Sequence, residues 1–165
     1  MRKSLPAILS VLLSAILIPA CEVENCPPNA LSFAHFTFVD QYGRNVVYTD
    51  TLSVYGQTDY GDSVVQDTLV NREMNVGELS LPLSYGTQTR FILRYNSRTQ
   101  DVITITHRNI PYFMNLDCGT MMFYEVTGAE TTSRMLDSLV ITNPNIDNNE
   151  KENFKIYFTV TDTGE

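Results

Sequence analysis

Short runs in which apolar and polar residues alternate recur along almost the whole chain, and this pattern limits the fold more than any other feature. Residues 76–83 place three leucines on one face at a period of two, and residues 154–161 alternate large apolar residues with Lys, Tyr and Thr. A period of two is typical of a β-strand that buries one face. The best chance of a helical turn, residues 131–136, is weak. The sequence therefore predicts an all-β protein.

The predicted strands are short and are separated by polar turns. They cover residues 31–39, 46–55, 63–70, 76–83, 89–95, 102–107, 110–114, 119–126, 138–142 and 154–161. The first two are expected to pair as a hairpin through a turn at residues 40–44, with Gly43 where freedom is most needed, and residues 56–62 are expected to be a loop. Pro82 marks an edge strand or a strand end. We expect an antiparallel β-sandwich of immunoglobulin-like type, with a small β-barrel as the alternative.

Residues 1–20 have the layout of a secretory signal. Arg2 and Lys3 give a basic start, and an apolar stretch follows as far as Ile18. That stretch is shorter than the ~20 residues that a membrane-spanning helix needs. These residues are therefore predicted to be an export signal and are left out of the fold.

Cys21 is predicted to carry a lipid. Residues 18–21 (Ile-Pro-Ala-Cys) resemble the bacterial lipobox, although Pro19 departs from the usual small residue. Glu22 and Glu24 follow, and this acidic pair resembles the surface-export signal of Bacteroidota lipoproteins. Acyl chains contribute about 0.8 kcal/mol of membrane affinity per buried methylene, so two or three chains anchor a protein stably. The alternative is an ordinary signal peptide with a cysteine near its cleavage site.

The other two cysteines are Cys26 and Cys118. An oxidising envelope favours a disulfide between them, and two separate thiols are the alternative. Residues 21–30 form a short tether, in which two prolines favour an extended chain. At ~3.5 Å per residue, the link from Cys21 to Cys26 reaches less than ~20 Å, so we expect the domain to lie close to its membrane.

Residues 31–165 are predicted to form a single β-sandwich domain. Removal of the signal, which contains two basic residues and no acidic one, takes the net charge from −8 to −10. This balance argues against a nucleic-acid ligand, because phosphate binding draws on a basic surface. It is also expected to keep the folded domain off the membrane leaflet.

The sequence predicts no catalytic, cofactor-binding or metal-binding residue. The motifs G-x-S-x-G, S-x-x-K and H-E-x-x-H do not occur. Residues 143–150 are rich in oxygen-bearing side chains, but Asn148 and Phe154 stand where an EF-hand needs Gly and Glu. A hairpin turn is preferred there over a calcium site. The same caution applies to Asp59, Asp62 and Asp67.

The histidines and the loop tyrosines are weak candidates for a site. His35 lies among phenylalanines and His107 ends a predicted strand, so both are expected in a wall or on the surface. Four tyrosines fall at or beside predicted loops, where binding residues tend to lie. They are Tyr42, Tyr55, Tyr60 and Tyr85. Core or rim positions are the default for them, and tryptophan, the strongest stacking residue for sugars, is absent.

Several short motifs stand out along the chain. They are the lipobox, the second cysteine soon after it, the LPLS segment at residues 81–84, the Cys118-Gly119 pair and residues 146–158. Together they resemble a family of small Bacteroidota lipoproteins that is catalogued as a domain of unknown function. The resemblance covers nearly the whole mature chain. It implies an envelope-anchored β domain with paired cysteines and lends no catalytic residue.

These observations favour a lipoprotein of the bacterial outer membrane, facing the periplasm or exposed at the surface. Its expected partners are the membrane, through the lipid on Cys21, and an unidentified envelope protein or glycan. The leading hypothesis is a non-enzymatic binding or assembly module. A carbohydrate-binding accessory protein and a small carboxylate-dependent hydrolase are the alternatives.

Overall fold

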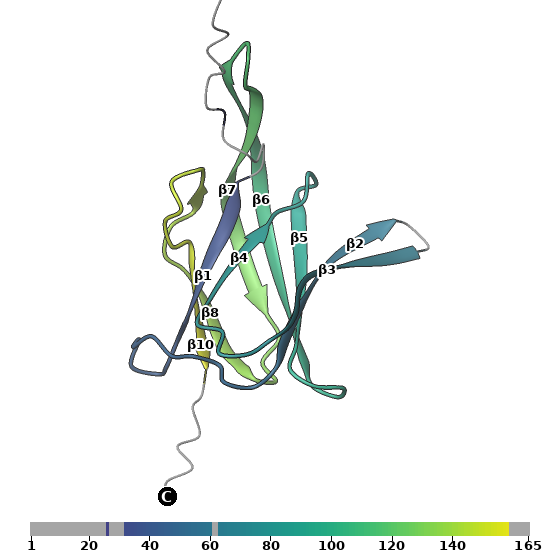
Figure 1. Cartoon of the computed structure of the whole chain (residues 1–165), viewed down its shortest axis with the longest axis vertical. Coiled ribbons are helices and arrows are strands. Elements are labelled where there is room, and N and C mark those ends of the chain that lie inside the picture. Colours follow the sequence, from purple (N-terminus) through teal and green to yellow (C-terminus); the bar gives the residue numbers. More distant parts are fainter. Residues whose placement is uncertain (1–25, 27–31, 61–62, 159–165) are drawn as a thin grey trace, which may run out of the picture.

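The computed structural model describes Cys26, residues 32–60 and residues 63–158. These residues form ten strands in two sheets (Figure 1). The strands are β1 (Phe33–Val39), β2 (Leu52–Tyr60), β3 (Ser63–Glu73), β4 (Glu78–Pro82), β5 (Gln88–Arg94), β6 (Gln100–Asn115), β7 (Gly119–Thr131), β8 (Leu136–Ile141), β9 (Asn145–Ile146) and β10 (Phe154–Phe158). The predicted signal, Cys21 and residues 27–30 of the tether lie outside the described residues. Within the described part, no helix has the length and hydrophobicity of a membrane span.

The smaller sheet has the strand order β4-β1-β10-β8. β1 pairs antiparallel with β4 and parallel with β10, where Phe36 lies opposite Phe154. β4 is an edge strand and ends at Pro82, as its proline predicts. The sheet is therefore mixed, whereas the sequence predicted an antiparallel arrangement throughout.

The larger sheet has the order β3-β2-β5-β6-β7-β9, and all its pairs are antiparallel. β5, β6 and β7 follow one another as a meander. The short strand β9 lies in the connection between β8 and β10 and pairs with β7, so this connection links the two sheets. The protein shares the two-layer architecture of an immunoglobulin domain but not its strand order. The sheets of a constant-type immunoglobulin domain contain no meander of three consecutive strands.

Side chains from both sheets meet in one apolar core. Fully buried members include Phe36, Phe38, Leu81, Phe154 and Ile156 from the smaller sheet, and Leu52, Phe91, Leu93, Ile103 and Ile105 from the larger. The Phe36 and Phe91 rings meet edge to face across the interface, with centroids 6.1 Å apart. Neither sheet closes on itself within the described residues, so the predicted β-sandwich is confirmed and the barrel is not adopted.

Two predictions of local structure were wrong. The expected hairpin of the first two strands is limited to one antiparallel bridge, Val39 with Asn45, and a hydrogen bond from the Val46 amide to the Phe38 carbonyl. β2 begins only at Leu52, and it belongs to the other sheet. The expected loop at residues 56–62 is mostly strand, because β2 runs to Tyr60 and pairs with β3 over its whole length. Residues 56–60 are mostly polar and show no alternation of apolar and polar side chains, so the sequence did not predict a strand there. The exposed hairpin of β2 and β3 points away from the sandwich in Figure 1.

The two strands predicted at residues 102–107 and 110–114 are one strand, β6. It alternates buried and exposed residues as far as His107 and then becomes exposed. The β6–β7 pairing continues to Asn115 and Gly119, with a register shift at Thr106 and His107. The end of this hairpin rises beyond the rest of the sandwich (Figure 1).

Candidate functional site

A groove of about 500 Å³ opens at the end of the larger sheet where β2 begins and β5 ends. We call it the arginine groove; it is lined by Asp50, Thr51, Ser53, Tyr55, Arg72, Arg94, Tyr95, Asn96 and Ser97. Arg72 on β3, Ser53 on β2 and Arg94 on β5 stand in a row across three neighbouring strands. The pairing of these strands therefore brings both arginines to the same groove.

Arg72 lines the groove at a β-bulge. The register of β2 and β3 shifts beside Ser53, so that Asn71 and Arg72 together oppose this one residue. Arg72 has a left-handed backbone with φ of 53°, and its amide donates a hydrogen bond to Ser53 Oγ at 3.1 Å. Such a conformation costs about 1–3 kcal/mol for a residue with a side chain, and strained residues cluster at functional sites. Bulges also re-aim side chains.

Arg94 is held by an aromatic ring. Its guanidinium carbon lies 4.7 Å from the centroid of the Tyr55 ring, within cation–π distance. Arg94 lies opposite Ser53 in the register of β5 and β2. Tyr55 lies two residues further along β2, on the same face as Ser53. This contact fixes the guanidinium at the groove while its N–H groups make no hydrogen bond to the described residues.

The two groove arginines differ electrostatically from other arginines of the chain. Arg44 is paired with Asp40, and Arg108 with Glu125. Arg72 and Arg94 have no carboxylate partner among the described residues, and the groove contains one acidic side chain, Asp50. Two guanidinium groups beside hydroxyl and amide groups suit a ligand that carries a carboxylate, because guanidinium binds carboxylate in a fork.

The rim of the groove is ordered by local hydrogen bonds. Asn96 Oδ1 accepts from the amides of Arg98 and Thr99, both at 2.8 Å, which closes the turn between β5 and β6. Tyr95 is buried, and its ring packs edge to face against Tyr48 at 5.5 Å. Burial, with the nearby charge of Asp101, raises the pKa of Tyr95, so this phenol stays neutral.

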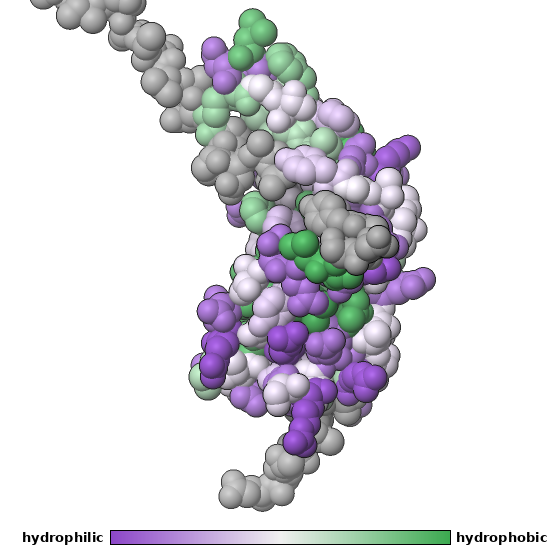
Figure 2. All heavy atoms as spheres, turned by 90° about the vertical axis from the view of Figure 1, so that its right-hand side faces the viewer, coloured by the Kyte–Doolittle hydropathy of each residue, from purple (hydrophilic) through white to green (hydrophobic). Residues whose placement is uncertain are grey.

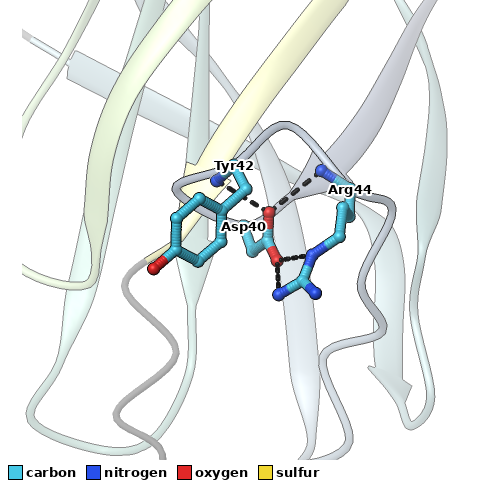
Figure 3. Close-up of polar contacts among 3 residues, drawn as sticks. All are labelled: Asp40, Tyr42 and Arg44. Carbon is cyan, nitrogen blue, oxygen red and sulfur yellow. Dashed lines mark hydrogen bonds and ion pairs between the residues drawn. The ribbon is translucent and has the colours of Figure 1, made fainter.

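The turn at residues 40–44 has the geometry that the sequence predicted, with Gly43 at φ of 78° (Figure 3). Asp40 accepts hydrogen bonds from the amides of Tyr42 and Arg44. It also forms an ion pair with the Arg44 guanidinium at 2.6 Å. Burial raises the pKa of Asp40, but these bonds outweigh it and hold the pKa below its ordinary value. The turn is a structural element, and Tyr42 is exposed at its surface.

His107 lies in a buried polar network that the sequence did not predict. Its Nδ1 is 2.9 Å from Asn109 Oδ1, and its Nε2 is 2.8 Å from Thr89 Oγ1. Asn109 donates its amide to the Tyr85 carbonyl, so its oxygen faces the ring and Nδ1 carries the proton. Burial lowers the pKa of His107, although Asn109 opposes this. The arrangement resembles a hydroxyl–His–Asn triad, but both Thr89 and His107 are buried and present no nucleophile at the surface.

The oxygen-rich segment at residues 143–150 belongs to the connection between antiparallel strands β8 and β10, as the hairpin interpretation predicted. Its side chains bond to their own turn: Asp147 accepts from the Asn149 amide at 2.9 Å, and Asn149 accepts from the Lys151 amide at 3.2 Å. No three His, Cys, Asp or Glu side chains gather at a metal-binding distance in the described part of the chain. Of Asp59, Asp62 and Asp67, the structure describes the side chain of Asp67, which is exposed.

The loop tyrosines do not share one surface. Tyr55 lines the arginine groove, Tyr42 belongs to the turn in Figure 3, and Tyr85 lines a separate hollow of about 600 Å³ beside β5. The side chain of Tyr60 lies outside the described residues. A stacking platform built from these four tyrosines is therefore not formed by the three that are described.

A third hollow, of about 280 Å³, lies on the smaller sheet. It is lined by His35, Phe36, Thr37, Glu78, Leu79, Ser80, Glu150 and Glu152. His35 is half-buried on β1, and its Nδ1 is 3.4 Å from Ser80 Oγ, so it belongs to a sheet face as predicted. Three glutamates near one histidine give the hydrolase hypothesis its best location, and that hypothesis stays a prediction.

Cys26 and Cys118 form a disulfide, as the sequence predicted, with their Cα atoms 5.2 Å apart. Cys118 lies in the turn between β6 and β7, at the far end of the projecting hairpin. The bond therefore joins the start of the described chain to the tip of this hairpin.

The chain matches one protein-family model over residues 39–158, which include β2 to β10, the groove and the projecting hairpin. No curated protein and no solved structure matches it. The match covers well over half of the chain, and this family has no known function. The chain is therefore a member of the family of unknown function DUF6452.

Proposed function

We propose that this protein is an envelope lipoprotein, anchored in the outer membrane by Cys21, whose β-sandwich is a non-enzymatic binding module. Its ligand site is the arginine groove, and the ligand is a saccharide that carries a carboxylate. This proposal joins the expected anchor with the chemistry of the one groove in which unpaired cationic groups converge among the described residues.

The observation that carries the proposal is the pair of guanidinium groups without a carboxylate partner in the described structure. The chain has a net charge of −8, so acidic partners are abundant elsewhere on its surface. Arg72 instead occupies a strained left-handed backbone, and Arg94 lies on Tyr55. Strained residues cluster at functional sites, and arginines whose guanidinium groups are free to bind suit a carboxylate.

The remaining groove residues suit a sugar. Thr51 and Ser97 offer hydroxyl groups, and Asn96 offers an amide that can bond to sugar hydroxyls. Asp50 accepts a hydrogen bond from the Thr51 amide at 2.6 Å, which engages its carboxylate at the groove wall. A single carboxylate against two arginines leaves the groove cationic.

A disulfide supports an exported protein, because such bonds persist in oxidising compartments such as the bacterial envelope. The anchor is tested by Cys21→Ser. Wild-type protein is expected in the detergent phase after phase partitioning and is expected to take up labelled fatty acid, whereas the variant is expected in the aqueous phase without label. A variant that still partitions into detergent contradicts the anchor.

The ligand is tested on a glycan array that displays uronic-acid oligosaccharides beside their neutral counterparts. We expect binding to the uronic acids alone. Arg94→Gln should weaken binding at least about tenfold, because a charge-assisted hydrogen bond contributes about 1.5–3 kcal/mol. Arg108→Gln, which removes a paired arginine outside the groove, is the matched control and should bind as wild type does. Equal binding of neutral and acidic glycans contradicts the proposal.

A further inference from the structure

The hairpin of β6 and β7 carries an apolar end that is largely exposed, although Met121 is buried and Met122 packs against the core. We call residues 110–123 the hairpin tip. It projects beyond the sandwich in Figure 1, and hydrophobic residues gather at this end in the space-filling view (Figure 2). Exposed apolar groups concentrated at one end of a soluble domain mark an interaction surface.

Four tip side chains have large exposed fractions. They are Ile110 at 39%, Tyr112 at 50%, Phe113 at 59% and Leu116 at 94%. Asp117 is the only charged residue in the sequence between Arg108 and Glu125. The ion pair of Arg108 and Glu125 lies below the tip and joins the two strands. The tip is thus a nearly neutral, apolar surface on a strongly acidic protein.

Both faces of the hairpin are apolar at the tip. Ile110 lies opposite Phe123 and Tyr112 lies opposite Met121, while Phe113 points to the other face of the strand. Tyr112 stacks on Phe123 with ring centroids 4.9 Å apart, which stiffens the hairpin. A strand that packs on a core needs only one apolar face. Parts of both faces are buried, at Met121 and Met122, so the apolar surface left for an interaction is formed by Ile110, Tyr112, Phe113 and Leu116.

The turn at the tip pairs two of its own backbone amides. Asn115 Oδ1 accepts hydrogen bonds from the amides of Asp117 at 3.1 Å and Cys118 at 2.7 Å. Gly119 then turns the chain with φ of 73°. A turn with paired amides enters a poorly hydrated environment at lower cost, because unpaired amides are expensive there.

The disulfide fixes where this surface lies relative to the proposed lipid. Cys118, within the tip, is bonded to Cys26. Cys21 is five residues before Cys26, so at ~3.5 Å per residue the chain between them spans at most about 18 Å. An anchor on Cys21 therefore holds the tip next to the membrane surface.

We propose that the hairpin tip contacts the lipid bilayer itself, with Phe113 and Leu116 inserted among the acyl chains and Tyr112 at the head groups. This inference rests on the anchor of the proposed function. Aromatic side chains with one polar end favour this interfacial depth. The occupant is the bilayer that holds the lipid, because the anchor already places it within reach and the nearly neutral tip is little repelled by it.

The contact also orients the domain. β6 has 16 residues and rises ~3.3 Å per residue, so its ends lie roughly 50 Å apart. The turn of the tip follows its last residue, and the arginine groove includes Asn96 and Ser97, which precede its first. A tip on the membrane therefore points the groove away from the bilayer.

The chain contains no tryptophan, which gives a direct test. The lipidated full chain with Phe113→Trp is reconstituted in phosphatidylethanolamine–phosphatidylglycerol vesicles that contain brominated lipid. We expect a blue-shifted emission that the bromine quenches. Tyr42→Trp is the matched control, because Tyr42 lies in the exposed turn after β1 and outside the hairpin tip. This variant should show neither effect. Adding Leu116→Asp to Phe113→Trp should remove most of the quenching.

Vesicle flotation of the same samples separates the two proposals. If the Phe113→Trp protein floats but its tryptophan emission is unshifted and unquenched, the anchor is present and the membrane contact is overturned. Protein that does not float contradicts the anchor. Excess vesicles are then added to the protein that did not float. Quenching of its tryptophan emission supports the tip contact, and an unchanged emission overturns the tip contact. A blue shift seen in native envelopes but not in lipid vesicles indicates a protein partner and also overturns it.

Discussion

The two ends of strand β6 present opposite surfaces. Before Gln100 lies the arginine groove, which is polar and carries two guanidinium groups without a carboxylate partner in the described structure. Around Asn115 lies the hairpin tip, which is apolar and nearly uncharged. The groove end is built from three strands and ordered by side-chain hydrogen bonds. The tip has two strands and is tied by a disulfide. One continuous strand thus separates a polar surface with two arginines from an apolar surface.

The division lies near the middle of β6, at the bulge of Thr106 and His107. Up to His107 alternate residues enter the core, and beyond it the strand is exposed. His107 packs edge to face on Tyr124 at this end of the core, with ring centroids 5.1 Å apart. Each end therefore has its own support, and the following predictions test whether the supports are independent.

The largest effect is expected from Asp101→Ala, at the groove end. Asp101 is fully buried and accepts four hydrogen bonds, from the Thr132 hydroxyl and the amides of residues 134–136, at 2.6 to 3.1 Å. Its loss leaves buried donors unpaired, so we expect the free energy of unfolding to fall by about 3–4 kcal/mol. Urea unfolding followed by circular dichroism measures this change.

Asp117→Ala is the control at the tip. This carboxylate is exposed, and its removal should change the free energy of unfolding by no more than about 0.5 kcal/mol. Similar losses in the two variants would show that the ends are not supported differently.

The second effect is expected from removal of the disulfide by a Cys26→Ser, Cys118→Ser double substitution. The bond closes a loop with a sequence separation of 92 residues, and losing it should cost about 2–4 kcal/mol. Hydrogen exchange should accelerate in the tip and stay unchanged around Arg72 and Arg94. If exchange accelerates equally at the groove, the disulfide stabilises the whole sandwich and the two ends are coupled.

Much of the fold followed from periodicity, because residues that alternate along a strand report directly on which face is buried. Phe91 and Leu93 enter the core while Arg90 and Arg94 do not, as their alternation predicted. Strand pairing did not follow. The parallel contact of β1 with β10 joins residues more than a hundred positions apart, and no local pattern encodes it. The outer part of β2, residues 56–60, was predicted to be loop because its polar residues form no apolar face.

The sites were less predictable than the fold. The disulfide followed from counting cysteines, whereas Arg72 reaches the groove through a bulge that depends on the register of two strands. The His107 network had one local signal, since His107 and Asn109 share a face of one strand. The tip also had a signal: the sequence between Arg108 and Glu125 contains a single charge. The sequence predicts ordinary strands there, because exposure is not visible in a sequence.

A third prediction concerns the boundary at His107. Burial lowers the pKa of this ring in the folded state below its unfolded value of ~6.5, so the unfolded chain takes up a proton first as the pH falls. Stability should therefore be fully present above pH ~6.5 and decline as the pH falls below it. Thermal unfolding between about pH 7.5 and 5.5 measures this, and His107→Gln should remove the dependence. A variant with the same pH dependence would assign it to other groups.

The smallest effect is expected from Arg72→Gly, and it separates stability from function at the groove. Glycine adopts a left-handed backbone without strain, so the variant should be about 1 kcal/mol more stable than wild type while its affinity for acidic glycans falls. Asn75, with φ of 59° outside the groove, is the matched control. Asn75→Gly should gain less, because asparagine tolerates this region, and should bind normally. A less stable Arg72→Gly would mean that the arginine side chain supports the fold, and the strain would then not indicate a ligand site.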